Sequence, residues 1–148
     1  MKIYIGADHN GFALKNSLVA YLRSNGYEVA DEGGDKLDPQ DDYPEFAARV
    51  ATAMRSGEGH HPRGILVCGS GQGICIAANR FKGIRAAVCN DAEEVIAGRN
   101  DDDTNVLCLP ARLLRTGEAE RLVSLWLETP FAGAARYKRR IRALDELG

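Results

Sequence analysis

Apolar residues along the chain follow two spacings in alternation. Short apolar runs between turn residues are typical of buried strands, and apolar positions three or four apart are typical of helices. Leu14, Leu18 and Leu22 repeat every four residues, for example, and Gly26 follows where a helix C-cap belongs. The pattern predicts strands at 2–7, 27–33, 64–69, 84–89 and 105–110. It predicts helices at 12–26, 45–57, 74–81, 92–99, 117–130 and 134–147.

This alternation favours a parallel sheet, because parallel neighbours need a crossover that packs a helix on the sheet. We therefore expect a single α/β domain over residues 1–148, a Rossmann-like three-layer sandwich whose five-stranded parallel sheet carries helices on both faces. Ligands of such sheets bind beyond the carboxyl ends of the strands. Asp8, His9, the loop at 68–73 and the segment after Cys89 should therefore meet near one crevice.

Composition and charge exclude several classes of partner. The 148 residues are 45% apolar and 27% charged, the balance of an ordinary globular protein. Nineteen basic and 21 acidic residues give a net charge of −2, which favours neither nucleic acid nor an anionic membrane. No apolar run approaches the roughly 20 residues needed to span a bilayer, and charge at Asp8 comes too early for a secretory signal. We expect a cytoplasmic protein with no membrane or nucleic-acid partner.

The cysteines and histidines do not form a metal-binding pattern. The four cysteines lie in or beside apolar runs with no CxxC pair, and His9, His60 and His61 are the only histidines. We expect no metal site and no disulfide framework, with Cys75, Cys89 and Cys108 as small buried hydrophobes. The His60-His61 pair is predicted to lie in a surface turn. The acidic run NDDDTN at 100–105 is better interpreted as a capped, solvated loop than as a Mg²⁺ site.

Three alternate glycines, Gly69, Gly71 and Gly73, follow Cys68 in the sequence VCGSGQGI. A loop of this kind between a strand and a helix exposes backbone N–H groups and suits an anion. The dinucleotide fingerprint GxGxxG would need glycine at Ile74, and no GK[ST] follows as in a P-loop. A tight turn explains one or two glycines rather than three beside a thiol, so the loop is a candidate site.

The position of Cys68 favours the thiolate, which nearby N–H groups and a helix dipole stabilise. A nucleophilic cysteine needs a histidine partner, whereas a base that removes a carbon-bound proton needs only the thiolate and donors to hold the resulting oxyanion. Near the C-terminus, Arg136 and Arg140 are four residues apart and share one helical face, which has room for a phosphate between them. A solvated charged face is the ordinary alternative.

Four stretches together resemble the ribose-5-phosphate isomerase B family, which includes the galactose-6-phosphate isomerase subunits. They are GADHNGFALK near the start, DDYPEFA at 41–47, VCGSGQGICIAANRFKGIRAA at 67–87 and NVLCLPAR at 105–112. The resemblance covers nearly the whole chain. It implies aldose–ketose isomerisation of sugar phosphates without a metal or another cofactor, in a homodimer or a dimer of dimers whose sites lie between subunits.

The resemblance also assigns roles by position. Cys68 matches the base that moves a proton between C1 and C2 through a cis-enediolate, and Ser70 matches the hydroxyl that polarises the substrate. The loop residues Gly69, Gly71, Gln72 and Gly73 would cradle the enediolate. The substrate contacts would be Asp8 and His9, with Tyr43 as a pocket wall and Arg112, Arg136 and Arg140 as phosphate ligands. The two C-terminal arginines would serve the partner's loop.

One departure from the family pattern concerns the substrate. Members that act on ribose phosphate read R-x-H-N, with a histidine that opens the furanose ring, whereas this chain has Asp101 and Asp102 at the last two positions. Tyr137 stands where some members have a histidine on the phosphate side. By position, Asp101 is the candidate catalytic residue for ring opening and Asp102 a candidate substrate contact. Either Asp101 still opens the ring, or the chain prefers an open-chain substrate, the pair erythrose 4-phosphate and erythrulose 4-phosphate, over ribose 5-phosphate. A hexose phosphate is a further candidate. There are two alternatives. The chain could be a phosphosugar-binding subunit that needs a paralogous partner, or it could be a nucleotide-binding Rossmann domain.

Overall fold

The computed structural model describes residues 1–57 and 59–148. Within these residues, five strands form one parallel sheet in the order β2-β1-β3-β5-β4, and the chain also forms six helices. The strands are β1 (Lys2–Ala7), β2 (Glu28–Asp31), β3 (Arg63–Cys68), β4 (Ala86–Val88) and β5 (Val106–Pro110). The helices are α1 (Phe12–Ser24), α2 (Tyr43–Ser56), α3 (Gln72–Ala78), α4 (Ala92–Asp102), α5 (Thr116–Glu128) and α6 (Ala135–Asp145). The predicted three-layer α/β sandwich is confirmed.

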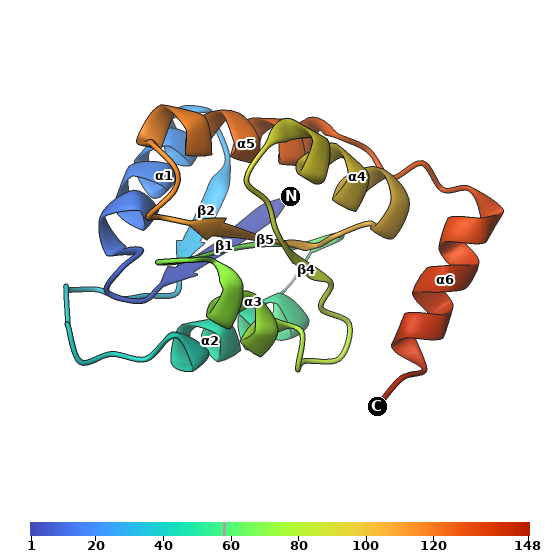
Figure 1. Cartoon of the computed structure of the whole chain (residues 1–148), viewed down its shortest axis with the longest axis horizontal. Coiled ribbons are helices and arrows are strands. Elements are labelled where there is room, and N and C mark those ends of the chain that lie inside the picture. Colours follow the sequence, from blue (N-terminus) through green and yellow to red (C-terminus); the bar gives the residue numbers. More distant parts are fainter. Residues whose placement is uncertain (58) are drawn as a thin grey trace.

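The strand order explains which face each helix covers. The connections that contain α2 and α3 advance in one direction along the sheet, and those that contain α1 and α4 run back the other way. Right-handed crossovers in opposite directions place their helices on opposite faces. Figure 1 shows α1, α4 and α5 on one side of the sheet and α2 and α3 on the other.

Each strand of the sheet's centre feeds both cores, because successive side chains of a strand point to opposite faces. In β3, Ile65 and Val67 belong to the core under α1, α4 and α5, while Leu66 and Cys68 belong to the core under α2 and α3. Trp126 of α5 is fully buried in the first core. Cys68 therefore lies at the carboxyl end of a central strand and faces the α2–α3 layer.

The direction of the connections reverses between β1 and β3. The chain leaves β1 toward β2 and then returns past β1 to β3, so the connections that follow β1 and β3 run in opposite directions along the sheet. The carboxyl ends of two such strands are the usual ligand position of these sheets. Ala7 and Val67 are paired there, and the Asp8 N–H donates to the Val67 carbonyl at 3.3 Å. The sequence thus places Asp8, His9 and Cys68 at the switch point.

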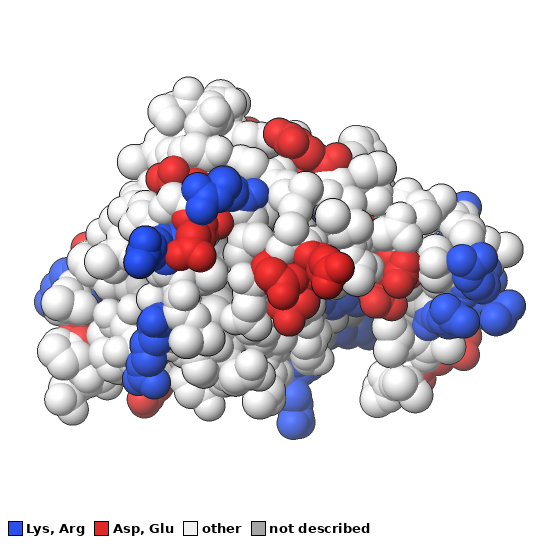
Figure 2. Space-filling view, turned by 45° about the horizontal axis from the view of Figure 1, so that its top comes forward, with Lys and Arg blue, Asp and Glu red and all other residues white. Residues whose placement is uncertain are grey.

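Helix α6 stands apart from the sheet (Figure 1). Among the described residues, none that belongs to α6 is buried, although Tyr137, Ile141 and Leu144 give it apolar positions. Lys and Arg side chains gather at the α6 end of the face in Figure 2. Among the residues described, no helix combines the length and the apolar character that crossing a membrane requires.

Two sequence expectations need correction. The predicted helix at 92–99 continues to Asp102, so Asp101 and Asp102 lie in the last turn of α4 rather than in a solvated loop. Asp103 ends this helix in the left-handed conformation, with φ of 46°. The predicted strand at 84–89 is shorter, because only Ala86–Val88 pair with β5. His60 and His61 are exposed in a turn, as predicted.

Candidate active site

The glycine loop after β3 is built around the Cys68 sulfur. The Gly71 N–H donates to Cys68 Sγ at 3.2 Å, and Cys68 is only 4% exposed. Gly71 has φ of +75°, a conformation that glycine adopts without strain. The Cys68 and Gly69 carbonyls accept from Ala111 N–H and Arg112 N–H at 2.9 and 3.0 Å, which ties the loop to the end of β5. The loop therefore holds a backbone donor on the thiol in a rigid setting.

The other two glycines make room for neighbouring side chains. A Cβ on Gly69 would lie 2.9 Å from Arg112 Nε, and a Cβ on Gly73 would lie 2.6 Å from Cζ of the Tyr43 ring. Arg112 and Tyr43 thus flank the loop from two sides, and both side chains are exposed. Ser70 is exposed at the loop's tip, where its Oγ accepts from the Gln72 N–H at 3.2 Å. The structure brings all of these predicted site residues together.

Asp8 and His9 follow β1 at the same edge of the sheet. Asp8 is buried, and its Oδ1 accepts from the N–H groups of Asn10 and Gly11 at 3.0 and 3.2 Å. Burial raises the pKa of the Asp8 carboxyl, and these two hydrogen bonds oppose the rise. His9 donates from both its backbone N–H and its ring Nδ1 to Asp41 Oδ1, each at 2.8 Å. The hydrogen bond to Asp41 is the largest cause of a raised pKa of His9.

Other predicted residues lie elsewhere in the chain. Asp101 and Asp102 end α4 beside Asn105, whose carbonyl accepts from the N–H of Gly64 at the start of β3. These residues lie at the amino ends of the strands, whereas Cys68 lies at the carboxyl end of β3. Arg136 and Arg140 lie on α6, both packed against the Tyr137 ring with guanidinium carbons 4.4 and 6.0 Å from its centre. One chain alone therefore does not bring these four residues to the glycine loop.

A family model described as Ribose/Galactose Isomerase matches residues 3–144 of this chain. Ribose-5-phosphate isomerase B of Escherichia coli is 42% identical over 146 residues, which cover 99% of this chain and 95% of that protein. D-erythrulose-4-phosphate isomerase of Pectobacterium atrosepticum is 38% identical over 133 residues, with 90% of this chain and 86% of that protein covered.

The chain belongs to the ribose/galactose isomerase family.

With this family it belongs to the aldose–ketose isomerases of sugar phosphates. Solved structures agree with the assignment. Ribose 5-phosphate isomerase of Thermotoga maritima superposes with a TM-score of 0.92 at 42% identity, over 99% of this chain and 98% of that one. Ribose-5-phosphate isomerase B of Mycoplasma genitalium, solved with bound ribulose-5-phosphate, gives a TM-score of 0.89 at 36% identity, over 99% and 97% of the two chains.

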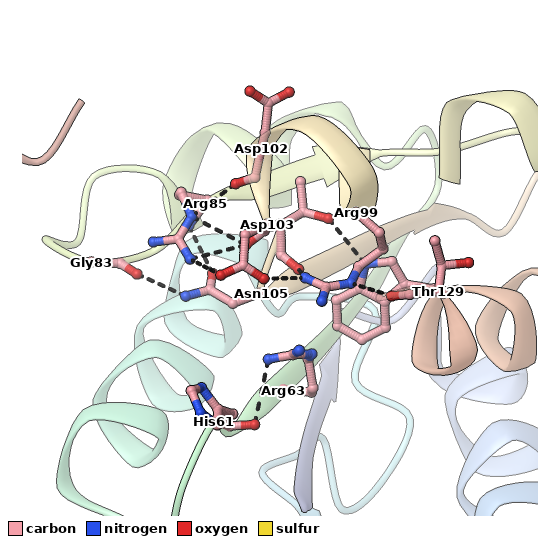
Figure 3. A network of polar contacts seen from close by, with 11 residues as sticks. His61, Arg63, Gly83, Arg85, Arg99, Asp102, Asp103, Asn105 and Thr129 are labelled. Carbon is pink, nitrogen blue, oxygen red and sulfur yellow. Dashed lines mark hydrogen bonds and ion pairs between the residues drawn. The ribbon is translucent and has the colours of Figure 1, made fainter. Parts of the chain in front are cut away.

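In this chain a polar network holds the end of α4 (Figure 3). Asp103 accepts from Arg99 at 2.7 Å and from Arg85 at 3.2 Å. Arg85 Nε also donates to the carbonyls of Asp102 and Asp103 at 3.0 and 3.1 Å, and so covers carbonyls that the helix end leaves unpaired. The network fixes the backbone of the acidic segment. It explains why α4 continues beyond its predicted end.

A pocket of about 760 Å³ adjoins this segment. It lies between the residues that lead into β4 and the end of α6, and its lining includes Arg80, Lys82, Arg85, Asp102 and Leu144. The pocket is remote from the glycine loop, because its walls belong to the α4 end and to α6. We interpret it as the space that α6 leaves beside the body of one isolated chain.

The remaining cysteines are buried, as the sequence predicts, and all four are free thiols. The Cys108 thiol is a hydrogen-bond partner of Cys75, which lowers the pKa of Cys75, while burial raises the pKa of Cys108. Burial also raises the pKa of Cys89 to about 12. These three thiols belong to the core, which leaves Cys68 as the cysteine of the loop. Among the described residues, no group of three or more His, Cys, Asp or Glu side chains is placed to hold a metal ion.

Asp41 is the site residue that the sequence analysis missed. It lies in a polar loop 32 positions after His9, and a contact at that separation leaves no periodic signal. The stretch DDYPEFA begins with Asp41, but the resemblance assigned a role in it only to Tyr43.

Proposed function

We propose that this chain is a cytoplasmic enzyme that interconverts an aldose phosphate and its ketose with the Cys68 thiolate as base. The thiolate takes the proton from C2 of the aldose, and the carbonyl oxygen on C1 becomes the anionic oxygen of a cis-enediolate. A proton passes between the oxygens on C1 and C2. The Cys68 thiol then returns its proton to C1, which leaves the carbonyl at C2. Atoms and charge balance without a cofactor.

The contact between the Gly71 N–H and Cys68 Sγ carries this proposal. A backbone donor stabilises a thiolate more than a thiol. In this proposal the enediolate is held by backbone N–H groups of the loop at 69–73 other than those of Gly71 and Gln72, which donate to Cys68 Sγ and Ser70 Oγ. In the same proposal the hydroxyl of Ser70, which is exposed at the tip of the loop, polarises the substrate carbonyl.

Phosphate binding in this proposal needs two chains. Arg112 lies against the loop of its own chain, whereas Arg136 and Arg140 project on α6, away from that loop. A helix with apolar positions and no buried residue among those described is suited to pack on a second copy. We propose a homodimer, or a dimer of such dimers, in which each glycine loop receives the arginines and the acidic α4 end of its partner.

Asp101 and Asp102, at the end of α4, are relevant to which substrate the enzyme uses. A carboxylate, with an ordinary pKa near 4, lacks a proton at neutral pH and is a poor donor to a sugar ring oxygen. A tetrose 4-phosphate cannot close the usual furanose ring, because its C4 oxygen carries the phosphate. We therefore propose an open-chain substrate, with erythrose 4-phosphate and erythrulose 4-phosphate as the pair. The relative named D-erythrulose-4-phosphate isomerase supports this choice.

Cys68→Ser tests the base. A serine hydroxyl supplies almost no alkoxide at neutral pH, so turnover should be nearly lost while the substrate still binds. Turnover can be followed by NMR of the sugar phosphates, and binding by calorimetry. A variant that keeps more than about a tenth of the parent kcat, a loss under about 1.4 kcal/mol, would contradict a thiolate base.

A second candidate is a subunit that needs a paralogous partner to supply the missing histidine. The observation that favours it is the pair Asp101 and Asp102 at the ring-opening positions. The purified single chain decides between the two, since a homodimeric enzyme should turn over an aldose phosphate alone. A panel of C4, C5 and C6 sugar phosphates then names the substrate. No turnover on any of them would favour the paired subunit.

A further inference from the structure

One carboxylate oxygen of Asp41 accepts two hydrogen bonds from His9. Asp41 Oδ1 accepts from the backbone N–H of His9 and from its ring Nδ1, each at 2.8 Å. The Asp41 side chain is 10% exposed and the His9 side chain is 31% exposed. The carboxylate therefore lies behind the ring, and the imidazole reaches solvent. His9 follows β1 at the end of the sheet where Cys68 follows β3.

These two hydrogen bonds fix the orientation of the imidazole ring and determine that Nδ1 carries a proton. Nδ1 points at a carboxylate and carries a proton, and Nε2 lies on the opposite side of the imidazole. The charged groups that act on His9 are Asp8, its neighbour in the chain, and Asp41, from the loop before α2. Both are carboxylates, and together they raise the pKa of His9 against an opposing effect of burial. The protonated ring then presents Nε2–H as a cationic donor.

We propose that Asp41 is a positioning residue, which orients the His9 ring so that Nε2–H donates to the anionic substrate. The inference rests on the proposed sugar-phosphate substrate. It assigns to Asp41 an effect on substrate binding, exerted through His9 without contact between Asp41 and the substrate. Loss of a cationic donor that binds substrate and transition state alike should raise KM and leave kcat nearly unchanged.

Asp41→Asn separates this role from mere support of the loop. Its amide oxygen still accepts from the His9 backbone N–H, so the loop stays in place, but the negative charge behind the ring is gone. Asp42→Asn is the matched control, because it removes the same charge one residue later from an exposed side chain that makes no cap hydrogen bond. The three histidines can be titrated by NMR, and His9→Gln identifies the signal of His9.

We expect the pKa of His9 to fall toward the ordinary value of about 6.5 in Asp41→Asn and to stay in place in Asp42→Asn. At pH 8, kcat/KM of Asp41→Asn should be about tenfold below that of the parent, mostly through KM. Near pH 5.5 the ratio of the two kcat/KM values should approach one, because His9 is protonated in both chains. Titration of Cys68 and of the substrate phosphate cancels in this ratio.

The proposal would be overturned if the pKa of His9 falls in Asp41→Asn but the ratio of kcat/KM between the parent and this variant stays constant with pH. The charge of His9 would then make no contribution to substrate binding. An unchanged pKa of His9 in Asp41→Asn would also overturn it, as would an equal loss in Asp42→Asn. A parent chain that turns over no sugar phosphate would instead refute the proposed function. The titration of His9 is measured without substrate, so the two failures are separate observations.

Discussion

Replacing Gly71 with alanine perturbs the loop where its backbone meets the Cys68 sulfur. Gly71 has φ of +75°, and the left-handed conformation costs an L-residue about 1–2 kcal/mol. The new Cβ would lie 3.1 Å from Val88 Cγ1 and 3.2 Å from the backbone nitrogen of Pro110. The Val88 side chain can shift, but the Pro110 nitrogen belongs to β5 and cannot. We expect the free energy of unfolding to fall by about 2 kcal/mol.

The same substitution should slow the reaction. A loop that turns to relieve this contact moves the Gly71 N–H away from Cys68 Sγ, and a hydrogen bond to a charged group contributes about 1.5–3 kcal/mol. If the thiolate loses that donor, kcat should fall by at least about tenfold, since each factor of ten corresponds to about 1.4 kcal/mol. Urea unfolding gives the stability, and steady-state kinetics on a sugar phosphate gives kcat.

Gly26→Ala is the matched control for backbone strain. Gly26 has φ of +85°, and nothing lies within 4 Å of its Cβ position, in the turn after α1. It should lose about 1–2 kcal/mol of stability with kcat unchanged. If Gly71→Ala also loses stability but keeps the parent kcat, the contact between Gly71 and Cys68 has no part in the chemistry, and the reasoning is wrong.

Two further predictions concern the assembly and pH. Arg140→Ala should raise KM by a factor that corresponds to about 1.5–3 kcal/mol. Mixing Arg140→Ala chains with Cys68→Ser chains should recover activity, because one of the two sites in each mixed dimer has both residues intact. Activity that stays lost would mean that each site is built within a single chain. The raised pKa of His9 stabilises the fold fully below its ordinary pKa and less as pH rises through its folded value. The difference in unfolding free energy between the parent and Asp41→Asn should therefore shrink as pH rises from 6 to 9, and a difference that grows would contradict the pairing.

The fold followed from the sequence because burial on both faces of a parallel sheet leaves local apolar runs. Strand order leaves no such trace, so the position of β5 between β3 and β4 became visible only in three dimensions. The end of α4 was misjudged for a related reason. Its last turn is held by Arg85 and Arg99 through Asp103, and Arg85 comes from a segment before β4.

In the candidate site, too, residues that are contiguous in the sequence could be predicted, whereas contacts between distant residues could not. Cys68 and its glycines are contiguous, so their chemistry was readable from one short stretch. Arg112 and Tyr43 were placed by resemblance, and the structure supplied the reason for Gly69 and Gly73, which accommodate those two side chains. Asp41 escaped notice because its hydrogen bonds are to His9, 32 positions away in the sequence.

The ratio of kcat/KM for erythrose 4-phosphate to that for ribose 5-phosphate, measured on the purified single chain, tests the central claim most directly. The proposed isomerase turns over both through Cys68 but opens no sugar ring efficiently, because Asp101 replaces the histidine. We expect the tetrose to be favoured by at least about tenfold, a difference of about 1.4 kcal/mol in transition-state stabilisation. A ratio of one or less would contradict an open-chain substrate, and no turnover of either sugar would contradict an isomerase that acts on these sugars as a single kind of chain.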